Sequence, residues 1–228
     1  MRLGSAAPVL VLAAALAGSC STDQQEPQAR TQSVTVEIGR PSQAGDSRSG
    51  QPAPRREKPQ VPGDARCDGA RQPTTEENLR EAEIAIRCLT NAAREENGLR
   101  PLEFDERLAR AAATRSNDMA RMNYFAHEGP DGGNVQRAVR RTGWIPSGRS
   151  WLLGENIGWA AEGGATPAQL VRSWLDSPTH RANLLADHFR QLGVGAVAAV
   201  PEKGASPGAT YTQVFGVTGR AARDAQSG

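Results

Sequence analysis

Apolar residues recur at three- and four-residue spacing over 74–97, the pattern of an amphipathic helix. Thr74 and Glu77 have the spacing of a capping box at its start, and an Asn-Gly pair ends it. A second helix is predicted from Asp105, as its N-cap, to the Gly/Pro-rich stretch 123–133. The apolar stripes of the two helices are Leu79, Ile86, Leu89 and Ala93, and Leu108, Ala111, Ala112, Met119 and Met122.

Three shorter helices are predicted further along the chain. One follows Asn134 and stops at Gly143. Another starts at Thr166, which is followed by proline at the first helical position and by glutamine at the third. The pair Ser177-Pro178 then opens a further short helix, with the serine as its N-cap.

The β-like segments lie late in the chain, at 192–200 and 210–217, with a Gly/Pro-rich turn between them. Helices that precede strands, with little strict alternation, favour an α+β fold built in layers over a doubly wound sheet. All four Trp, two Tyr and four Phe lie between Phe104 and Phe215, so the packed core belongs to the second half of the chain. We expect one domain over 67–220.

Residues 21–66 are rich in Gln, Ser, Pro, Gly and Arg and lack a sustained apolar period. Such a composition predicts a disordered tether, because it buries too little apolar surface to offset chain entropy. The alternation "SVTVEI" at 33–38 favours a strand, which would be marginal in isolation. The last residues, 221–228, are expected to form a flexible tail.

The N-terminus has the features of an export signal over residues 1–20. Arg2 is followed by the apolar run "APVLVLAAALAG" and then by Ser19 and Cys20. Two kinds of processing fit: ordinary cleavage after Ala17, or a lipobox in which Cys20 carries the lipid.

The cysteine count favours the lipobox. Three cysteines in an exported chain leave one unpaired. Lipidation of Cys20 would leave Cys67 and Cys88 as a disulfide pair, which suits an oxidising compartment. The expected location is therefore the cell membrane or envelope through a lipid anchor, with secretion into the medium as the alternative.

Charge and motifs exclude several classes of function. The net charge of +2 and the absence of a basic block with interleaved aromatics exclude a nucleic-acid partner. The sequence has no His-Glu-x-x-His, no Cys-x-x-Cys and no phosphate-binding glycine loop. The stretch "GVGAV" at 193–197 is too short for a dinucleotide fingerprint and ends in a strand.

Glu155, within the apolar segment "SWLLGENIGWA", is the sharpest candidate for a site residue. A carboxylate among such neighbours must be paired, hydrogen-bonded or bound to a metal. It either belongs to a site or has a structural role, capping a turn or holding an arginine.

Two of the three histidines are candidates as well. His127 follows Tyr-Phe-Ala at the predicted end of the second helix, where a structural role is the alternative. His180 falls at the third helical position after Ser177, where the positive end of the helix disfavours imidazolium. His188 has no supporting feature and is expected in a surface loop.

Six segments in a fixed order resemble the CAP superfamily, which includes cysteine-rich secretory proteins and plant pathogenesis-related proteins, and in particular its bacterial secreted branch. They are "NAAREENGLRPLEFDERLARAAATRSNDMA", "YFAHEGPDG", "GENIGWA", "SWLDSPTHRANLL", "LGVGAV" and "YTQVFG".

The resemblance implies an α-β-α sandwich around a small, largely antiparallel sheet, and a cavity that in many members holds two histidines and two acidic residues. His127 and Glu155 match this pattern. The place of the second acidic residue holds Ser177, and that of the second histidine holds Thr210, whereas His180 stands where bacterial relatives typically have a histidine.

Two functions follow as expectations. The first is a tethered binding module that recognises an envelope component, a lipid or a protein through its His/Glu-lined cleft. The alternative is a hydrolase, peptidase-like, in which His127, Glu155 and His180 hold a divalent metal such as zinc or work as acid and base. Asp176, Glu162 and Tyr211 are candidates for a fourth ligand.

Overall fold

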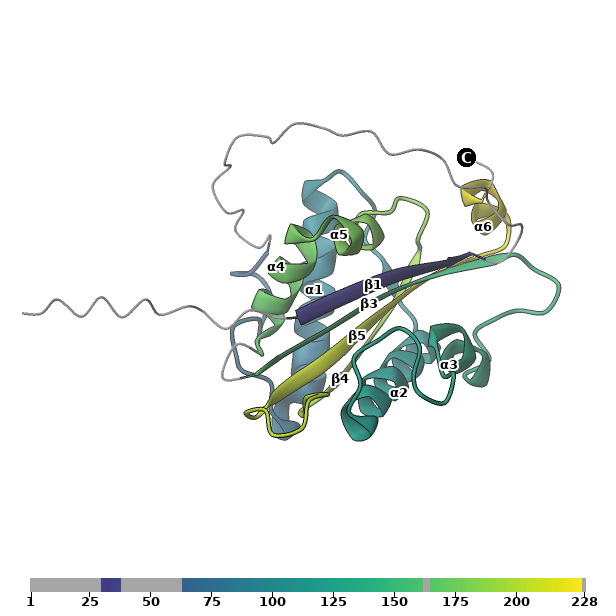
Figure 1. Ribbon diagram of the computed structural model, residues 1–228. Helices are drawn as coiled ribbons and strands as arrows, with labels where there is room; N and C mark the ends of the chain where they lie inside the picture. The colour runs from purple at the N-terminus through teal and green to yellow at the C-terminus, as the bar shows by residue number, and fades with distance from the viewer. Residues whose placement is uncertain (1–29, 38–62, 162–164, 227–228) are drawn as a thin grey trace, which may run out of the picture.

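A computed structural model describes residues 30–37, 63–161 and 165–226, with the backbone alone for 30–37. Five strands form one sheet in the order β1-β3-β5-β4-β2 (Figure 1). All neighbours pair antiparallel except β2 and β4, which are parallel. The strands are β1 (Arg30–Glu37), β2 (Glu103–Phe104), β3 (Trp151–Ala161), β4 (Gln191–Val197) and β5 (Gly208–Thr218).

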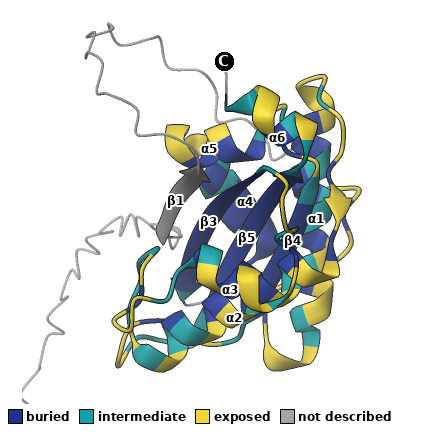
Figure 2. Ribbon diagram, turned by 90° about the vertical axis from the view of Figure 1, so that its right-hand side faces the viewer, coloured by how far each residue is buried: buried dark blue, intermediate teal, exposed yellow. Residues whose placement is uncertain are grey.

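Helices cover both faces of this sheet, which confirms the α-β-α sandwich (Figure 1). On one face lie α1 (Leu79–Glu96), α4 (Pro167–Asp176) and α5 (Pro178–Leu184). On the other lie α2 (Glu106–Met122) and α3 (Val135–Arg141). The inward sides of these elements are buried and the outward sides of the helices are exposed (Figure 2).

The predicted N-caps of α2 and α4 are confirmed, and Asn134, after which a short helix was predicted, is the N-cap of α3. The Asp105 carboxylate accepts the backbone N–H of Arg107 at 2.8 Å and of Leu108 at 3.2 Å. Asn134 and Thr166 each accept one backbone N–H from the residue three places further on. These bonds satisfy donors that have no partner within a helix, so local sequence is enough to place the three helix starts.

The first helical segment starts one residue later than predicted, and α1 itself begins only at Leu79. A 3-10 turn (Glu76–Asn78) precedes α1, and Thr75 rather than Thr74 is the cap. The Thr75 backbone N–H donates to Asn78 Oδ1 at 2.8 Å, which is the return bond of the capping box. The Thr74 hydroxyl is hydrogen-bonded to Tyr211 Oη at 2.6 Å instead. Thr74, which the local pattern predicted to cap the helix, therefore makes a tertiary contact with Tyr211 instead.

The two glycines of "GVGAV" let α2 lie directly on β4. A Cβ on Gly193 would lie 2.1 Å from the carbonyl carbon of Leu108. A Cβ on Gly195 would lie 2.1 Å from the backbone nitrogen of Ala113. Backbone atoms cannot move aside as a flexible side chain can, so these positions exclude any larger residue. The glycines serve close helix–sheet packing rather than nucleotide binding.

Residues 30–37 depart from the predicted tether. They form β1, which pairs with β3 from Arg30 opposite Trp159 to Glu37 opposite Leu152. The strand expected at 33–38 therefore exists, but it is neither isolated nor confined to that stretch. Residues 63–66 form a turn at the beginning of the folded domain. The rest of the tether prediction, and the signal with Cys20, lie outside the described residues.

The C-terminal segment is a helix rather than a flexible tail. Residues Arg220–Ala225 form α6, which lies at one end of the sheet (Figure 1). Ala222 is fully buried, and Gln226 Nε2 donates to the backbone oxygen of Trp151 at 3.2 Å. The prediction failed because this six-residue helix owes its order to contacts with β3 and β5.

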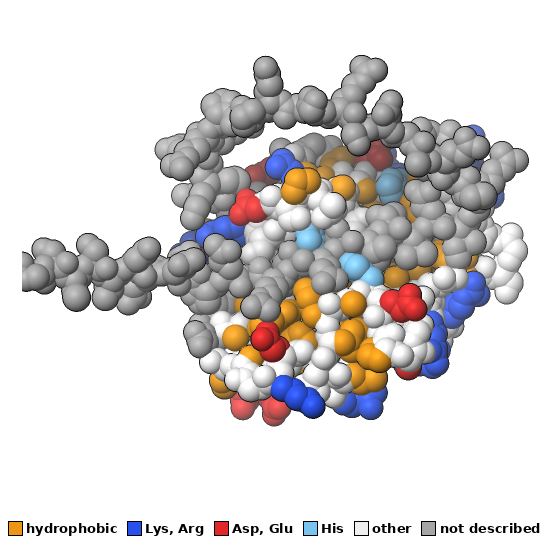
Figure 3. Space-filling model, viewed as in Figure 1, with side chains coloured by type: hydrophobic (Ala, Val, Ile, Leu, Met, Phe, Trp, Pro, Cys, Tyr) orange, Lys and Arg blue, Asp and Glu red, His pale blue; other side chains and the backbone are white. Residues whose placement is uncertain are grey.

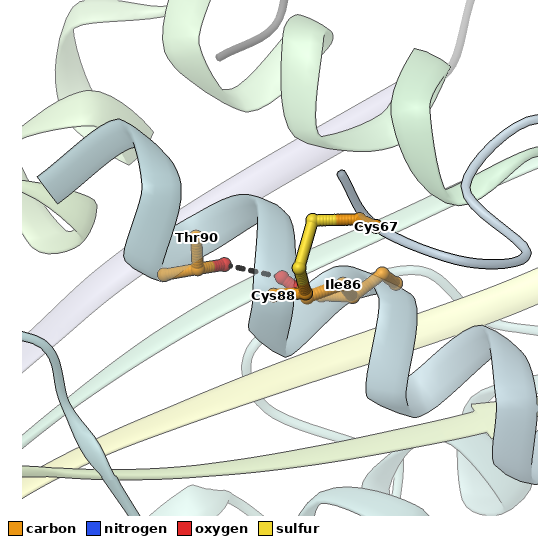
Figure 4. The surroundings of a disulfide bond; sticks show 4 residues. All are labelled: Cys67, Ile86, Cys88 and Thr90. Atoms are coloured by element: carbon orange, nitrogen blue, oxygen red, sulfur yellow. Dashed lines mark hydrogen bonds between the residues drawn. A yellow bond between two sulfur atoms is a disulfide. The ribbon is translucent and has the colours of Figure 1, made fainter. Parts of the chain in front are cut away.

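The predicted disulfide between Cys67 and Cys88 is confirmed, with the two Cα atoms 5.7 Å apart. It joins the turn that precedes α1 to the middle of that helix (Figure 4). In the part of the chain that the structure describes, no helix is both long and apolar enough to cross a membrane.

Candidate functional site

Glu155 lies in the middle of β3, and its side chain is completely buried. Its Oε1 accepts a hydrogen bond from Arg115 Nε at 3.0 Å, and its Oε2 lies 2.6 Å from His127 Nδ1. Both carboxylate oxygens are therefore engaged, as the burial expected from the sequence requires. Glu155 therefore has both of the roles that the sequence left open. It holds an arginine, which is the structural role, and it pairs with His127, which is the role in a site.

Arg115, which sequence reasoning missed, organises this site from α2. Its side chain is 2% exposed. Besides Glu155, its guanidinium donates to Tyr124 Oη at 2.8 Å and to the backbone oxygens of Ala126, His127 and Gly133 at 3.0, 2.9 and 3.3 Å. These five bonds match the five N–H donors of the group. Arg115 thus fixes the loop that carries His127.

The surroundings shift the pKa of both Arg115 and Tyr124. Burial acts to lower the pKa of Arg115, but the charge and hydrogen bond of Glu155 outweigh it and raise that pKa. Burial raises the pKa of Tyr124, with the Arg115 charge acting in the opposite direction. The arginine is therefore a permanent cation, and the tyrosine stays a neutral phenol that accepts a hydrogen bond from it.

His127 is the member of this group that reaches the surface, with 21% of its side chain exposed. Because Nδ1 contacts Glu155, the ring is held in one orientation. The second ring nitrogen, Nε2, is buried and has no hydrogen-bond partner in the described structure. The site thus presents an oriented imidazole whose Nε2 remains to be satisfied.

His180 lies at the third position of α5 and is 3% exposed. Its Nδ1 lies 2.7 Å from Ser177 Oγ. The Ser177 side chain makes no cap hydrogen bond to the helix backbone, so the predicted capping role of its hydroxyl is wrong. The hydroxyl contacts the imidazole instead.

A network of buried amides, also missed from the sequence, connects His180 to β3. Asn156 Nδ2 donates to the His180 backbone oxygen at 3.2 Å, and Asn183 Nδ2 donates to Asn156 Oδ1 at 3.0 Å. Asn156 Nδ2 also donates to Gln213 Oε1 at 3.3 Å. Successive side chains of a strand point to opposite faces, so Glu155 and Asn156 hold the two histidines on opposite sides of the sheet.

The model of the cysteine-rich secretory protein (CAP) family matches residues 89–214, which is more than half of the chain. The chain belongs to the CAP family.

Two relatives of this CAP protein come from Bacillus subtilis (strain 168). The uncharacterized protein YkwD is 37% identical over 127 residues, which are 56% of this chain and 44% of the relative. The uncharacterized membrane protein YlbC is 36% identical over 114 residues, which are 50% of this chain and 31% of the relative. The chain thus spans less than half the length of these curated relatives.

Solved structures with similarity to this CAP protein are bacterial. An extracellular protein containing a SCP domain from Bacillus anthracis str. Ames has a TM-score of 0.49 at 32% identity, over 63% of this chain and 44% of that one. An outer surface protein from Borrelia burgdorferi has a TM-score of 0.48 at 17% identity, over 63% of this chain and 94% of that one.

The three expected metal ligands of this CAP domain do not form a metal centre. Within residues 63–161 and 165–226, no group of three His, Cys, Asp or Glu side chains is arranged to hold a metal ion. Glu155 Oε1 accepts from Arg115 and Oε2 contacts His127 Nδ1, so both carboxylate oxygens are already engaged, and His180 Nδ1 contacts Ser177. The donor set therefore does not fit zinc, which needs three protein ligands and an open position in a catalytic site.

The other positions considered for the CAP cavity do not complete it either. Asp176 is exposed, and Glu162 lies outside the described residues. Tyr211 is buried and donates to the Ala165 backbone oxygen at 2.7 Å, and burial raises its pKa. Thr210, at the place of the family's second histidine, donates to the Ala199 backbone oxygen at 2.7 Å. His188, as expected, lies in a loop with 29% of its side chain exposed.

Proposed function

We propose that this chain is an exported CAP-domain protein of the bacterial cell envelope that binds an envelope component at the site around His127. The observation that carries this proposal is the arrangement of Arg115, Glu155 and His127. The buried charged groups of Arg115 and Glu155 are fully hydrogen-bonded and orient the imidazole of His127. The Nε2 atom of this imidazole has no hydrogen-bond partner within the described structure.

Such an arrangement favours recognition of a ligand. A ring that is already oriented loses little conformational freedom when a ligand binds, and this lowers the cost of binding. The buried Nε2 gains a hydrogen bond from a ligand that supplies a polar group, because an unsatisfied buried polar atom costs about 1–3 kcal/mol. The site thus gives a physical reason for a ligand without requiring a metal.

Export and membrane attachment are supported by the sequence and the disulfide. The pairing of Cys67 with Cys88 suits an oxidising compartment and leaves Cys20 as the remaining cysteine. Cys20 follows an apolar run and Ala-Gly-Ser, which supports its lipidation. Mass spectrometry of the mature protein is expected to show an acylated Cys20 at the N-terminus. An N-terminus at Gly18 with unmodified Cys20 would contradict the anchor and support secretion.

The binding function is tested with the mature chain and three probes: purified peptidoglycan sacculi, vesicles of phosphatidylethanolamine and phosphatidylglycerol, and pools of short unstructured peptides. We expect at least one probe to bind the parent and to bind His127→Ala at least tenfold more weakly. His188→Ala, which removes an imidazole from a surface loop, is the matched control and should bind as the parent does. Equal binding by the parent and both variants to every probe would contradict the proposal.

Metal dependence is a separate measurement on the same samples. Because the donors do not fit zinc, we expect no stoichiometric zinc by elemental analysis and unchanged probe binding in the presence of a chelator. Stoichiometric zinc that is lost in both His127→Ala and His180→Ala would overturn this expectation and restore the metal-dependent hydrolase.

A further inference from the structure

β1 pairs with β3 at the two residues that hold the histidines. Val34 lies opposite Glu155, which bonds to His127, and Ser33 lies opposite Asn156, which bonds to the His180 backbone. The strand also packs beside α5 and α4 (Figure 1). Histidine side chains reach the surface on the face of the molecule that Figure 3 shows. β1 therefore lies at the site itself rather than at a remote edge of the sheet.

β1 lies outside the part of the chain that the CAP family model matches. The CAP family match begins at residue 89, whereas β1 ends at Glu37. Without β1, the 11-residue β3 would be the edge strand of the sheet, with β5 as its partner on the other side. An edge strand presents unpaired backbone N–H and C=O groups to any extended chain that can reach them. The domain thus has a strand-accepting edge beside His127.

We propose that the outer edge of β3, from Leu152 to Trp159, binds an extended polypeptide that adds to the sheet as a strand. In the structure this edge is paired with Arg30–Glu37, which another extended polypeptide can replace. The inference rests on the proposed binding function and names its ligand class. In this mode of recognition, main-chain hydrogen bonds provide affinity, and pockets for alternate side chains provide specificity. A lipid or a glycan cannot form this ladder.

The resident strand also controls access to the site. It belongs to the same chain as the domain, so it competes with any other polypeptide as an intramolecular ligand. A polypeptide ligand binds only in the fraction of molecules from which β1 has left, and its apparent affinity falls by that fraction. An eight-residue strand with one neighbour in the sheet is a segment that can leave without unfolding the rest of the sheet.

The test uses the mature chain, the variant Val34→Pro/Thr35→Pro, and the control Ser42→Pro/Gln43→Pro. In β1, every second backbone N–H donates to β3. Two adjacent prolines therefore remove one of these donors, whichever of the two positions faces β3. The probe is a fluorescent peptide with the sequence of residues 30–37, and its reference is the same peptide with proline at the places of Val34 and Thr35. Binding is measured by fluorescence anisotropy, and backbone amide exchange is followed in β3 and β5.

We expect the peptide to bind Val34→Pro/Thr35→Pro at least fivefold more tightly than it binds the parent or the control. The proline peptide should not bind. Alternate amides over 152–159 should exchange at least tenfold faster in the variant, and adding the peptide should restore their protection. Amides of β5 should remain protected in all three proteins, which shows that the fold persists.

A variant with protected β5 amides that binds the peptide no better than the parent would overturn the inference. This result is separate from the test of the proposed function. Loss of sacculus or vesicle binding in His127→Ala, together with no peptide binding, would leave the binding function standing and remove the strand-accepting edge. Peptide binding with no effect of His127→Ala on any probe would support the strand-accepting edge and contradict the proposed binding function at His127.

Discussion

Arg115 Nε donates to Glu155 Oε1 at 3.0 Å, and the two side chains are 2% and 0% exposed. This ion pair joins α2 to β3 through the interior of the domain. Its charges are compensated because every donor of the guanidinium and both oxygens of the carboxylate have partners. The pair therefore belongs to the structure that positions His127, and removing one half of it should be costly.

Replacing Arg115 with methionine should lower the free energy of unfolding by about 3–5 kcal/mol, because it leaves the Glu155 carboxylate buried without its cation. Urea denaturation of the purified variant measures this change. Arg110→Met is the matched control on the same helix. Its pair with Glu106 is exposed and should contribute about 0.5 kcal/mol or less. Similar losses in the two variants would contradict the role assigned to Arg115.

The Arg115 pair also shows how far the sequence could predict this site. Glu155 was found because its apolar neighbours predicted a buried carboxylate. Its partner lies 40 residues away on another element, where α2 offers several arginines of equal chemistry. One signal was present: Arg115 falls on the apolar stripe with Leu108, Ala111 and Met119, where a charged residue must find a buried partner.

Other differences between prediction and structure have the same origin. The caps at Asp105 and Thr166 depend on residues within three positions, so local sequence predicted them. By contrast, β1 is ordered by contacts with β3, and α6 by contacts with β3 and β5, and a local pattern cannot supply those contacts. The sequence therefore predicted a tail where the chain forms a helix, and it predicted a strand at 33–38 without the partner that this strand pairs with.

Removing the disulfide should destabilise the domain without abolishing the site. Cys67 and Cys88 are 21 residues apart, and closing a loop of this length contributes about 3 kcal/mol in the chain-entropy model. We expect Cys67→Ala/Cys88→Ala to lose this amount in urea denaturation, and the parent with reductant to behave in the same way. Cys20→Ser should match the parent under both conditions, since Cys20 is outside the pair. A loss in Cys20→Ser that reductant does not change would argue against this assignment.

Glu83 should make the domain less stable as the pH rises. Burial raises the pKa of this carboxyl, although its hydrogen bond from the Ala196 N–H and the Arg80 charge oppose the shift. The folded state then binds the proton more tightly than the unfolded state does. Its contribution to stability is therefore complete below the unfolded pKa of about 4.3 and is lost as the pH rises through the raised folded value.

The variant Glu83→Gln keeps an oxygen acceptor for Ala196 and removes the ionisation. Relative to this variant, the parent should lose stability as the pH rises above the unfolded pKa of about 4.3, as measured by urea denaturation at several pH values. Glu81→Gln removes a carboxylate from an exposed position of the same helix and serves as the control. If the two variants differ from the parent by the same amount at every pH, burial of Glu83 is not the cause.

The bond between Ser177 and His180 can be distinguished from a helix cap by a double-mutant cycle. The Ser177 hydroxyl lies 2.7 Å from the buried His180 Nδ1, so Ser177→Ala should cost about 1–3 kcal/mol of unfolding free energy. In a His180→Ala background this cost should disappear, because the partner is gone. Thr179→Ala removes the exposed hydroxyl that also contacts Ser177 Oγ, at 3.3 Å, and should cost less than Ser177→Ala because this contact is longer and exposed. If Ser177→Ala costs the same with and without the imidazole, the hydroxyl caps the backbone of α5, as the sequence pattern had indicated.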